Sequence, residues 1–193
     1  MPPELVPSRY RLINAAHVRR CAGPRCACWH ALRSPTRNWY NTVFADLTDA
    51  TYTLYPTGGG TDILARSPSP ALVTSPATND QYGIILGGTA GLNQPDRRTM
   101  EAPFPNGNGA GLIFYTGATT VTVIQSSDNY GLVITRALQY GGPNTIAVRE
   151  MGLLSLGPVN RYLLMYDPFA TDIVLLSGVA NLAQYVLQTR YQN

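Results

Sequence analysis

Residues 21–30, CAGPRCACWH, hold all three cysteines of the chain and one of its two histidines. Thiolate and imidazole groups are preferred zinc ligands, so Cys21, Cys26, Cys28 and His30 form a candidate metal set. Structural zinc sites usually take two pairs of ligands separated by a loop that folds around the ion. Four ligands within ten residues would make a cramped cage. Zinc is therefore the alternative here, and we expect no metal and no cofactor.

A disulfide is the other chemistry open to these cysteines. Three thiols leave one unpaired, and Cys26 and Cys28 are too close in sequence for an unstrained bridge. The spacing allows Cys21 to pair with either of them. Otherwise free cysteines bury as small apolar side chains in a contact, which is the arrangement that we expect.

Catalytic chemistry has few candidates elsewhere in the chain. Both histidines, His17 and His30, precede residue 34, so residues 34–193 hold no Ser-His-Asp or Cys-His set of their own. All 14 basic residues are arginine, which excludes a Schiff-base lysine and a P-loop lysine. The paired carboxylates fall at turns and at a helix end, where Asp commonly stabilises the backbone. We expect no catalytic residues and no enzymatic activity.

Charge is distributed unevenly along the chain. Residues 1–40 carry seven arginines against Glu4 alone, while the remainder carries seven arginines against ten acidic residues. The net charge of +3 therefore conceals a basic N-terminal arm on a mildly acidic body. Interleaved apolar residues favour protein subunits over nucleic-acid phosphates as its partner, with nucleic acid as the alternative. The expected partner-binding residues are Arg9, Arg11, Arg19, Arg20, Arg25, Trp29 and Arg33.

The composition is also poor in charge overall. Only 13% of the residues are charged, against roughly 25% in typical soluble domains. A surface with so little charge favours burial against other subunits, so we expect a homo-oligomer or another symmetric assembly. No run of residues approaches the ~20 apolar residues of a membrane span, and no signal-peptide core is present, so we expect no membrane contact.

Sequence patterns divide the chain into an extended arm, residues 1–33, and a body, residues 34–193. A short helix is expected within residues 10–20 of the arm. At the start of the body, Ser34 is a favourable N-cap and Pro35 suits the first helical position. Apolar residues at helical spacing follow, which predicts a helix over about residues 35–48.

The rest of the body has the pattern of an all-β protein. Short segments rich in β-branched and aromatic residues alternate with turn signals such as Ser126-Ser127-Asp128-Asn129 and Gly141-Gly142-Pro143-Asn144. No helical periodicity separates them. This spacing predicts an antiparallel β-sandwich, with long loops at residues 66–80 and 89–110.

Several short motifs follow one another between residues 37 and 191. RNWYNTVFADL is similar to a G-N-W-x-R-N-F helix, and YGIILGGTAG to a G-I-x-V-G-T-G strand. Further along come Val148, Glu150, Gly152 and Leu153 in a V-x-E-x-G-L pattern, Arg161 and Asp167 in an R-x-hydrophobic-R-D pattern with Tyr166 in place of the second arginine, and Val174, Gly178 and Tyr185 in a hairpin pattern. This order of motifs resembles a family of small virion-associated proteins of tailed bacteriophages.

The resemblance implies a structural protein of a virion, assembled in the host cytoplasm, with other virion proteins as its partners. We expect a capsid cement or decoration subunit that grips neighbouring subunits with its arm. A neck or tail structural or adhesion subunit is one alternative. A virion protein that contacts nucleic acid through the arginine-rich arm is the other.

Overall fold

The fold is described from a computed structural model of the chain. Placement is described for residues 9–14, 30–31, 36–48, 52–64, 73–92, 94, 96–125, 129–157 and 160–190. Within these ranges strands predominate, all pairings between them are antiparallel, and α2 is the single helix. The all-β fold class is therefore confirmed.

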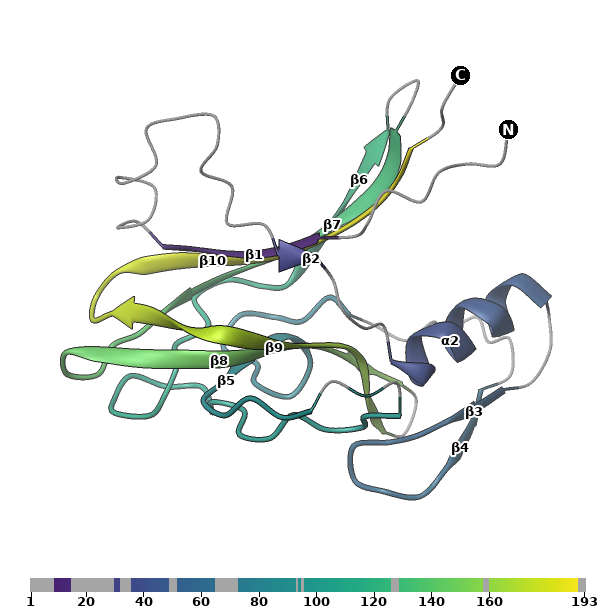
Figure 1. The fold of residues 1–193 in the computed structure, drawn as a ribbon, viewed down its shortest axis with the longest axis horizontal. Coiled ribbons are helices and arrows are strands. Elements are labelled where there is room, and N and C mark those ends of the chain that lie inside the picture. Colours follow the sequence, from purple (N-terminus) through teal and green to yellow (C-terminus); the bar gives the residue numbers. More distant parts are fainter. Residues whose placement is uncertain are drawn as a thin grey trace.

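The larger sheet has five strands in the order β2-β1-β10-β7-β6. Its strands are β1 (Arg9–Asn14), β2 (His30–Ala31), β6 (Thr120–Gln125), β7 (Asn129–Gln139) and β10 (Ala180–Arg190). β7 and β10 form its centre, pairing from Ala180 opposite Gln139 to Arg190 opposite Asn129. Figure 1 shows β6 and the adjoining ends of β7 and β10 sweeping away from the rest of the body.

Part of the expected arm belongs to this sheet. β1 pairs with β10 over its whole length, from Arg9 opposite Val186 to Asn14 opposite Asn181. Residues 9–14 of the expected arm therefore belong to the larger sheet, and the helix expected within residues 10–20 is wrong for residues 10–14. Residues 9–14 read RYRLIN, in which arginine alternates with Tyr10 and Leu12. Alternation with a period of two is typical of a strand, which explains why these residues form β1.

A smaller sheet has the order β5-β8-β9. Its strands are β5 (Gly83–Gly87), β8 (Thr145–Leu156) and β9 (Arg161–Leu176). The long pairing of β8 with β9 is interrupted between Val148, opposite Ile173, and Glu150, opposite Pro168. A separate hairpin joins β3 (Tyr52–Leu54) to β4 (Asp62–Leu64).

Side chains of the larger sheet and of the smaller sheet share one core. Ile134 and Leu138 of β7 and Met151 and Leu153 of β8 are each at most 2% exposed. The Tyr185 hydroxyl on β10 donates a hydrogen bond to the Met151 carbonyl on β8 at 3.0 Å. The two sheets are thus joined by a side-chain hydrogen bond of a core tyrosine as well as by apolar packing.

Helix α2 (Arg37–Thr48) lies beside β3 and β4 at one end of the body (Figure 1). It starts slightly later than the expected residue 35. The backbone N–H of Thr36 donates to the Leu164 carbonyl of β9 at 2.9 Å, and its hydroxyl donates to Leu163 at 2.5 Å. The start of α2 is therefore fixed to β9. Across the described ranges, no helix has the length and apolar character that a membrane crossing needs.

Candidate functional site

Most of the residues expected to bind a partner or a metal lie outside the described ranges. These are Arg19, Arg20, Arg25, Trp29, Arg33, Cys21, Cys26 and Cys28. Arg9 and Arg11 fall in β1 and His30 in β2, which places their backbones at the edge of the larger sheet. Among the residues that the structure describes, no group of three or more His, Cys, Asp or Glu could hold a metal ion.

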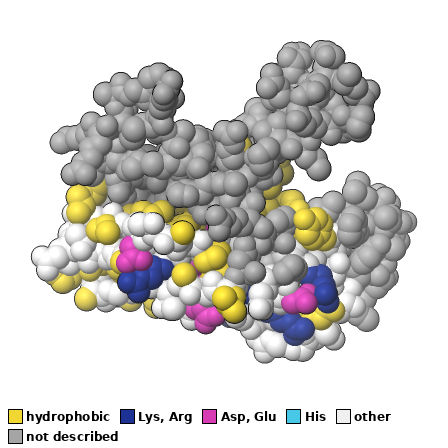
Figure 2. Space-filling model, viewed as in Figure 1, with side chains coloured by type: hydrophobic (Ala, Val, Ile, Leu, Met, Phe, Trp, Pro, Cys, Tyr) yellow, Lys and Arg dark blue, Asp and Glu magenta, His cyan; other side chains and the backbone are white. Residues whose placement is uncertain are grey.

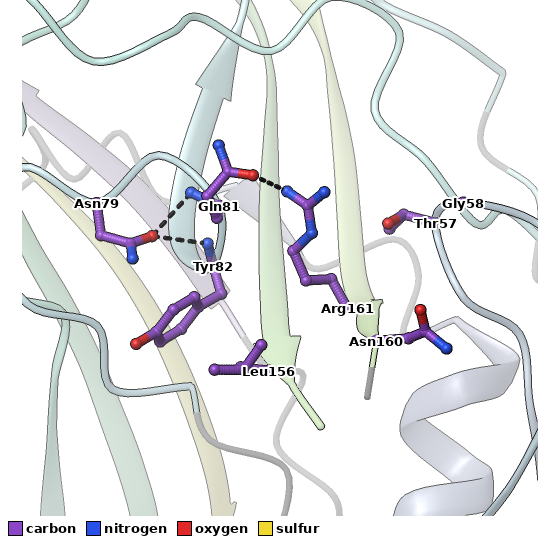
Figure 3. Close-up of a pocket in the computed structure, with 8 residues that line it drawn as sticks. All are labelled: Thr57, Gly58, Asn79, Gln81, Tyr82, Leu156, Asn160 and Arg161. Atoms are coloured by element: carbon purple, nitrogen blue, oxygen red, sulfur yellow. Dashed lines mark hydrogen bonds between the residues drawn. The ribbon is translucent and has the colours of Figure 1, made fainter. Parts of the chain in front are cut away.

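A pocket of about 430 Å³ lies where three turns meet at one end of the smaller sheet (Figure 3). Its lining comes from the β3–β4 turn, the segment before β5, the end of β8 and the start of β9. The residues are Thr57, Gly58, Asn79, Gln81, Tyr82, Leu156, Asn160 and Arg161. The lining is dominated by amide and hydroxyl groups, and Arg161 is its one charged residue.

Hydrogen bonds hold these turns in place. The Asn79 Oδ1 atom accepts the backbone N–H of Gln81 at 2.8 Å and that of Tyr82 at 3.1 Å (Figure 3). The N–H of Thr57 donates to the Arg161 carbonyl at 2.9 Å. Asn is favoured in such turns because its side chain replaces a backbone acceptor. The pocket walls are therefore fixed by local sequence.

Gln81 positions the Arg161 guanidinium at the mouth of the pocket. Arg161 Nη1 donates to Gln81 Oε1, and Gln81 Nε2 donates to Asp80 Oδ1 at 2.6 Å. Burial raises the pKa of Asp80, but the N–H of Asn106 and the Gln81 amide outweigh it, so the net pKa lies below its ordinary value. Within the described ranges Arg161 has no ion-pair partner, which leaves its other N–H donors facing solvent.

A second pocket of about 250 Å³ adjoins the first. The two share Thr57, Gln81 and Arg161, so Arg161 stands between them. The remaining lining of the second is mostly apolar and consists of Ile85, Met100, Pro103 and Leu154, with Asp80 and Thr99. We call the two pockets together the Arg161 groove, with a polar half and an apolar half.

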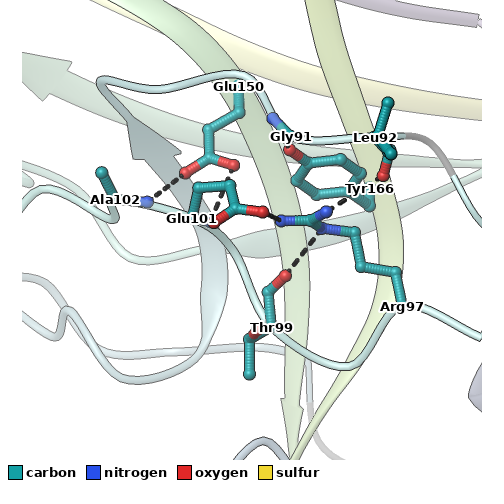
Figure 4. A network of polar contacts seen from close by, with 8 residues as sticks. All are labelled: Gly91, Leu92, Arg97, Thr99, Glu101, Ala102, Glu150 and Tyr166. Atoms are coloured by element: carbon teal, nitrogen blue, oxygen red, sulfur yellow. Dashed lines mark hydrogen bonds and ion pairs between the residues drawn. The ribbon is translucent and has the colours of Figure 1, made fainter.

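A buried polar network holds the loop between β5 and β6 (Figure 4). The fully buried Glu150 carboxylate accepts the backbone N–H of Glu101 at 3.0 Å and that of Ala102 at 2.8 Å. The hydroxyl of Tyr166 accepts the N–H of Gly91 at 2.7 Å. Burial, followed by its hydrogen bond to Glu150, raises the pKa of Tyr166. Glu150 and Tyr166, both singled out in the sequence motifs, therefore meet in space and fix the loop between β5 and β6.

Arg97 closes this network from the solvent side. Its guanidinium carbon lies 4.1 Å from the centroid of the Tyr166 ring and its Nη2 pairs with Glu101 at 2.5 Å (Figure 4). It also donates to the carbonyls of Leu92 at 3.0 Å and Thr99 at 2.8 Å. These contacts anchor the loop, and they engage the Arg97 guanidinium with groups of the same chain.

Arg136 of β7 is not among the residues expected from the sequence, and it has no exposed surface. Its side chain donates to main-chain carbonyls, including that of Ile84 at 2.9 Å and that of Asn79. Burial lowers its pKa to about 10. The signal was present in ITRALQY, in which Arg136 shares the inward period of Ile134 and Leu138.

Aliphatic side chains are exposed on the outermost strands. Val121 and Val123 of β6 are 37% and 54% exposed, and Val174 and Leu176 of β9 are 45% and 40% exposed. On the face shown in Figure 2, uncharged and apolar groups cover most of the surface of the described residues, and charged groups lie in isolated clusters. An uncharged outer strand such as β6 is suited to pairing with another protein.

Comparison of the chain with family models, curated proteins and solved structures finds no match. Functional conclusions therefore depend on the geometry of the described residues. Buried Glu150 and Arg136 are used to anchor loops. The Arg161 groove and the exposed aliphatic side chains of the outer strands face outward.

Proposed function

We propose that the chain is a non-enzymatic accessory structural protein of a tailed-phage virion. Its body is a β-sandwich, and it joins neighbouring capsid subunits as a cement or decoration protein. The contact is made by the arginine-rich connection, which we define as residues 15–29. Assembly takes place in the host cytoplasm, and the protein resides in the virion.

The position of β1 and β2 in the larger sheet is the observation that carries this proposal. Tyr10 of β1 pairs with His30 of β2, and β1 in turn pairs along β10. The arginine-rich connection is therefore tethered to the sheet at both of its ends. A doubly tethered segment loses less conformational entropy on binding a partner than a free tail does.

The body supports an assembly role in a second way. The exposed valines of β6 and the low content of charged residues favour contact with protein subunits. Two buried groups whose chemistry could serve catalysis, Glu150 and Arg136, are engaged with main-chain atoms. These features support a structural role over an enzymatic one. A neck or tail subunit would use the same contacts at another position in the particle.

Deletion of residues 1–33 would not test this proposal, because it also removes β1 from the sheet. The sharper variant is Arg19→Ser, Arg20→Ser and Arg25→Ser together, which leaves β1 and β2 intact. Arg149→Ser is the matched control, since Arg149 is an exposed arginine on β8. The measurement is the number of copies per purified virion by quantitative mass spectrometry.

We expect the triple variant to lose most of its copies from the virion and the control to keep the wild-type number. A triple variant that incorporates normally would overturn the proposed contact. Strong DNA binding by the purified protein that falls steeply with salt would instead favour the nucleic-acid alternative.

A further inference from the structure

We propose that the Arg161 groove binds residues 3–6, Pro-Glu-Leu-Val, of a neighbouring copy of this chain. Glu4 pairs with Arg161 in the polar half, and Leu5 enters the apolar half. The inference rests on the proposed assembly role, and it names a contact between copies that the role itself does not require.

The guanidinium of Arg161 has the donors that a carboxylate needs. Gln81 occupies Nη1 and fixes the plane of the group. Arginine has five N–H donors in a rigid fork, which matches the two oxygens of a carboxylate. The polar pocket contains no acidic residue in its lining, so a carboxylate entering there meets neutral amides and hydroxyls.

The apolar half lies on the other side of Arg161. Ile85 and Met100 form its buried wall at 1% and 7% exposure, and Leu154 and Pro103 complete it. Asp80 also lines this half. Its lowered pKa keeps it charged, so it would repel a second carboxylate here. The groove therefore orders its occupant, with the acid on one side of Arg161 and an aliphatic side chain on the other.

The N-terminal sequence has this order of groups. Residues 1–40 are strongly basic, and Glu4 is their only acidic residue. Leu5 and Val6 follow it directly. Pro2, Pro3 and Pro7 flank these residues and favour an extended backbone, which lowers the entropy cost of binding in a groove. The segment therefore offers a carboxylate followed directly by aliphatic side chains, which complements Arg161 and the apolar half of the groove.

A segment that docks in the groove of the next copy makes a heterologous contact. Such contacts generate rings when the rotation closes and open chains when it does not. The proposed contact therefore supplies one interface of a symmetric assembly. It is independent of the contact proposed for the arginine-rich connection.

The test uses the full chain with Glu4→Arg as receptor, because its own N-terminal segment cannot compete for the groove. The probe is a fluorescent peptide of residues 1–8, and binding is followed by fluorescence anisotropy. We expect binding that weakens about tenfold or more when Arg161→Glu is added, in line with loss of a charge-assisted pair. The peptide with Glu4→Arg should then regain affinity for that double variant.

Two controls keep the result interpretable. Adding Arg149→Glu to the receptor removes an exposed arginine outside the groove and should leave peptide affinity unchanged. An unchanged urea midpoint for the Arg161→Glu receptor shows that it is folded. A peptide that does not bind the folded receptor, or binds it equally with Arg161→Glu, overturns the inference. Virion incorporation of the arginine-connection variant is a separate measurement, so either proposal can fail alone.

Discussion

The guanidinium carbon of Arg136 lies 4.1 Å from the centroid of the Tyr115 ring, and neither side chain has exposed surface. The Tyr115 hydroxyl accepts the N–H of Leu86 at 3.2 Å and donates to the Phe104 carbonyl at 3.3 Å. The pair therefore joins β7, β5 and two loops at one point of the core. The segment that carries Asn79 and Gln81, and hence one wall of the Arg161 groove, depends on this junction.

Arg136→Met should destabilise the fold strongly. The substitution keeps much of the apolar volume but leaves the carbonyls of Asn79 and Ile84 without the guanidinium. Loss of a buried charged network of this kind costs about 3 kcal/mol of unfolding free energy. Urea unfolding followed by circular dichroism measures the change. Arg149→Met, at an exposed ion pair with Asp172, should leave the midpoint nearly unchanged. Equal effects of the two variants would contradict the structural role of Arg136.

Tyr115 should make stability depend on pH in the alkaline range. Burial raises its pKa from 10.0 to about 12. The folded state therefore keeps a proton that the unfolded state releases, and this contribution, complete below pH 10, is lost as pH rises towards 12. Arg136 acts in the opposite direction, because burial lowers its pKa. Comparison with Tyr115→Phe isolates the tyrosine, and that variant should lose less unfolding free energy over this range. Identical pH profiles of the wild type and Tyr115→Phe would show that burial does not raise the pKa of Tyr115.

Gly87→Ala should disrupt the network around Glu150. A methyl group at this position would overlap Glu150 Oε1 and would lie 2.7 Å from the Ala102 carbonyl oxygen. Movement of Glu150 would disturb its hydrogen bond with the Ala102 N–H, and movement of the Ala102 carbonyl would disturb its hydrogen bond with the Gly88 N–H. We expect a loss of about 2 kcal/mol, typical of overpacking in a closed site.

Gly58→Ala is the matched control for this prediction. A Cβ atom there meets no heavy atom within 4 Å, so its unfolding free energy should stay within about 0.5 kcal/mol of wild type. Hydrogen exchange adds a local measurement, because the amides of Glu101 and Ala102 should lose protection in Gly87→Ala alone. Retained protection would mean that the loop does not depend on Glu150.

The sequence predicts the β-rich body because its signals there are local. Alternation and turn residues are read within a few positions, as in β7 and β8. The strand at residues 9–14 is different, since its partner β10 lies at the other end of the chain. A local pattern cannot show a partner so far along the chain, and pairing with β10 is what makes residues 9–14 a strand.

The candidate site was harder to predict than the fold. Arg161 and Glu150 were noted in motifs, but a motif does not distinguish a solvent-facing guanidinium from a buried carboxylate. The Arg161 groove forms only where turns at Thr57, Asn79 and Gly157 come together, which requires the tertiary arrangement. The three cysteines are candidate zinc ligands by their number alone, and they lie outside the described ranges.

Val123→Lys should reduce self-association through the edge of the larger sheet. Val121 and Val123 lie on one face of the outermost strand β6, and Thr122 lies on the other. A lysine on the apolar face of an edge strand opposes pairing with a second strand, while exposed substitutions change folding stability by about 0.5 kcal/mol at most. Light scattering of the purified protein at increasing concentration measures the effect. Thr122→Lys adds the same charge to the opposite face and should reduce association less. Equal reduction by both variants would assign the effect to net charge and would contradict a contact through the valine face.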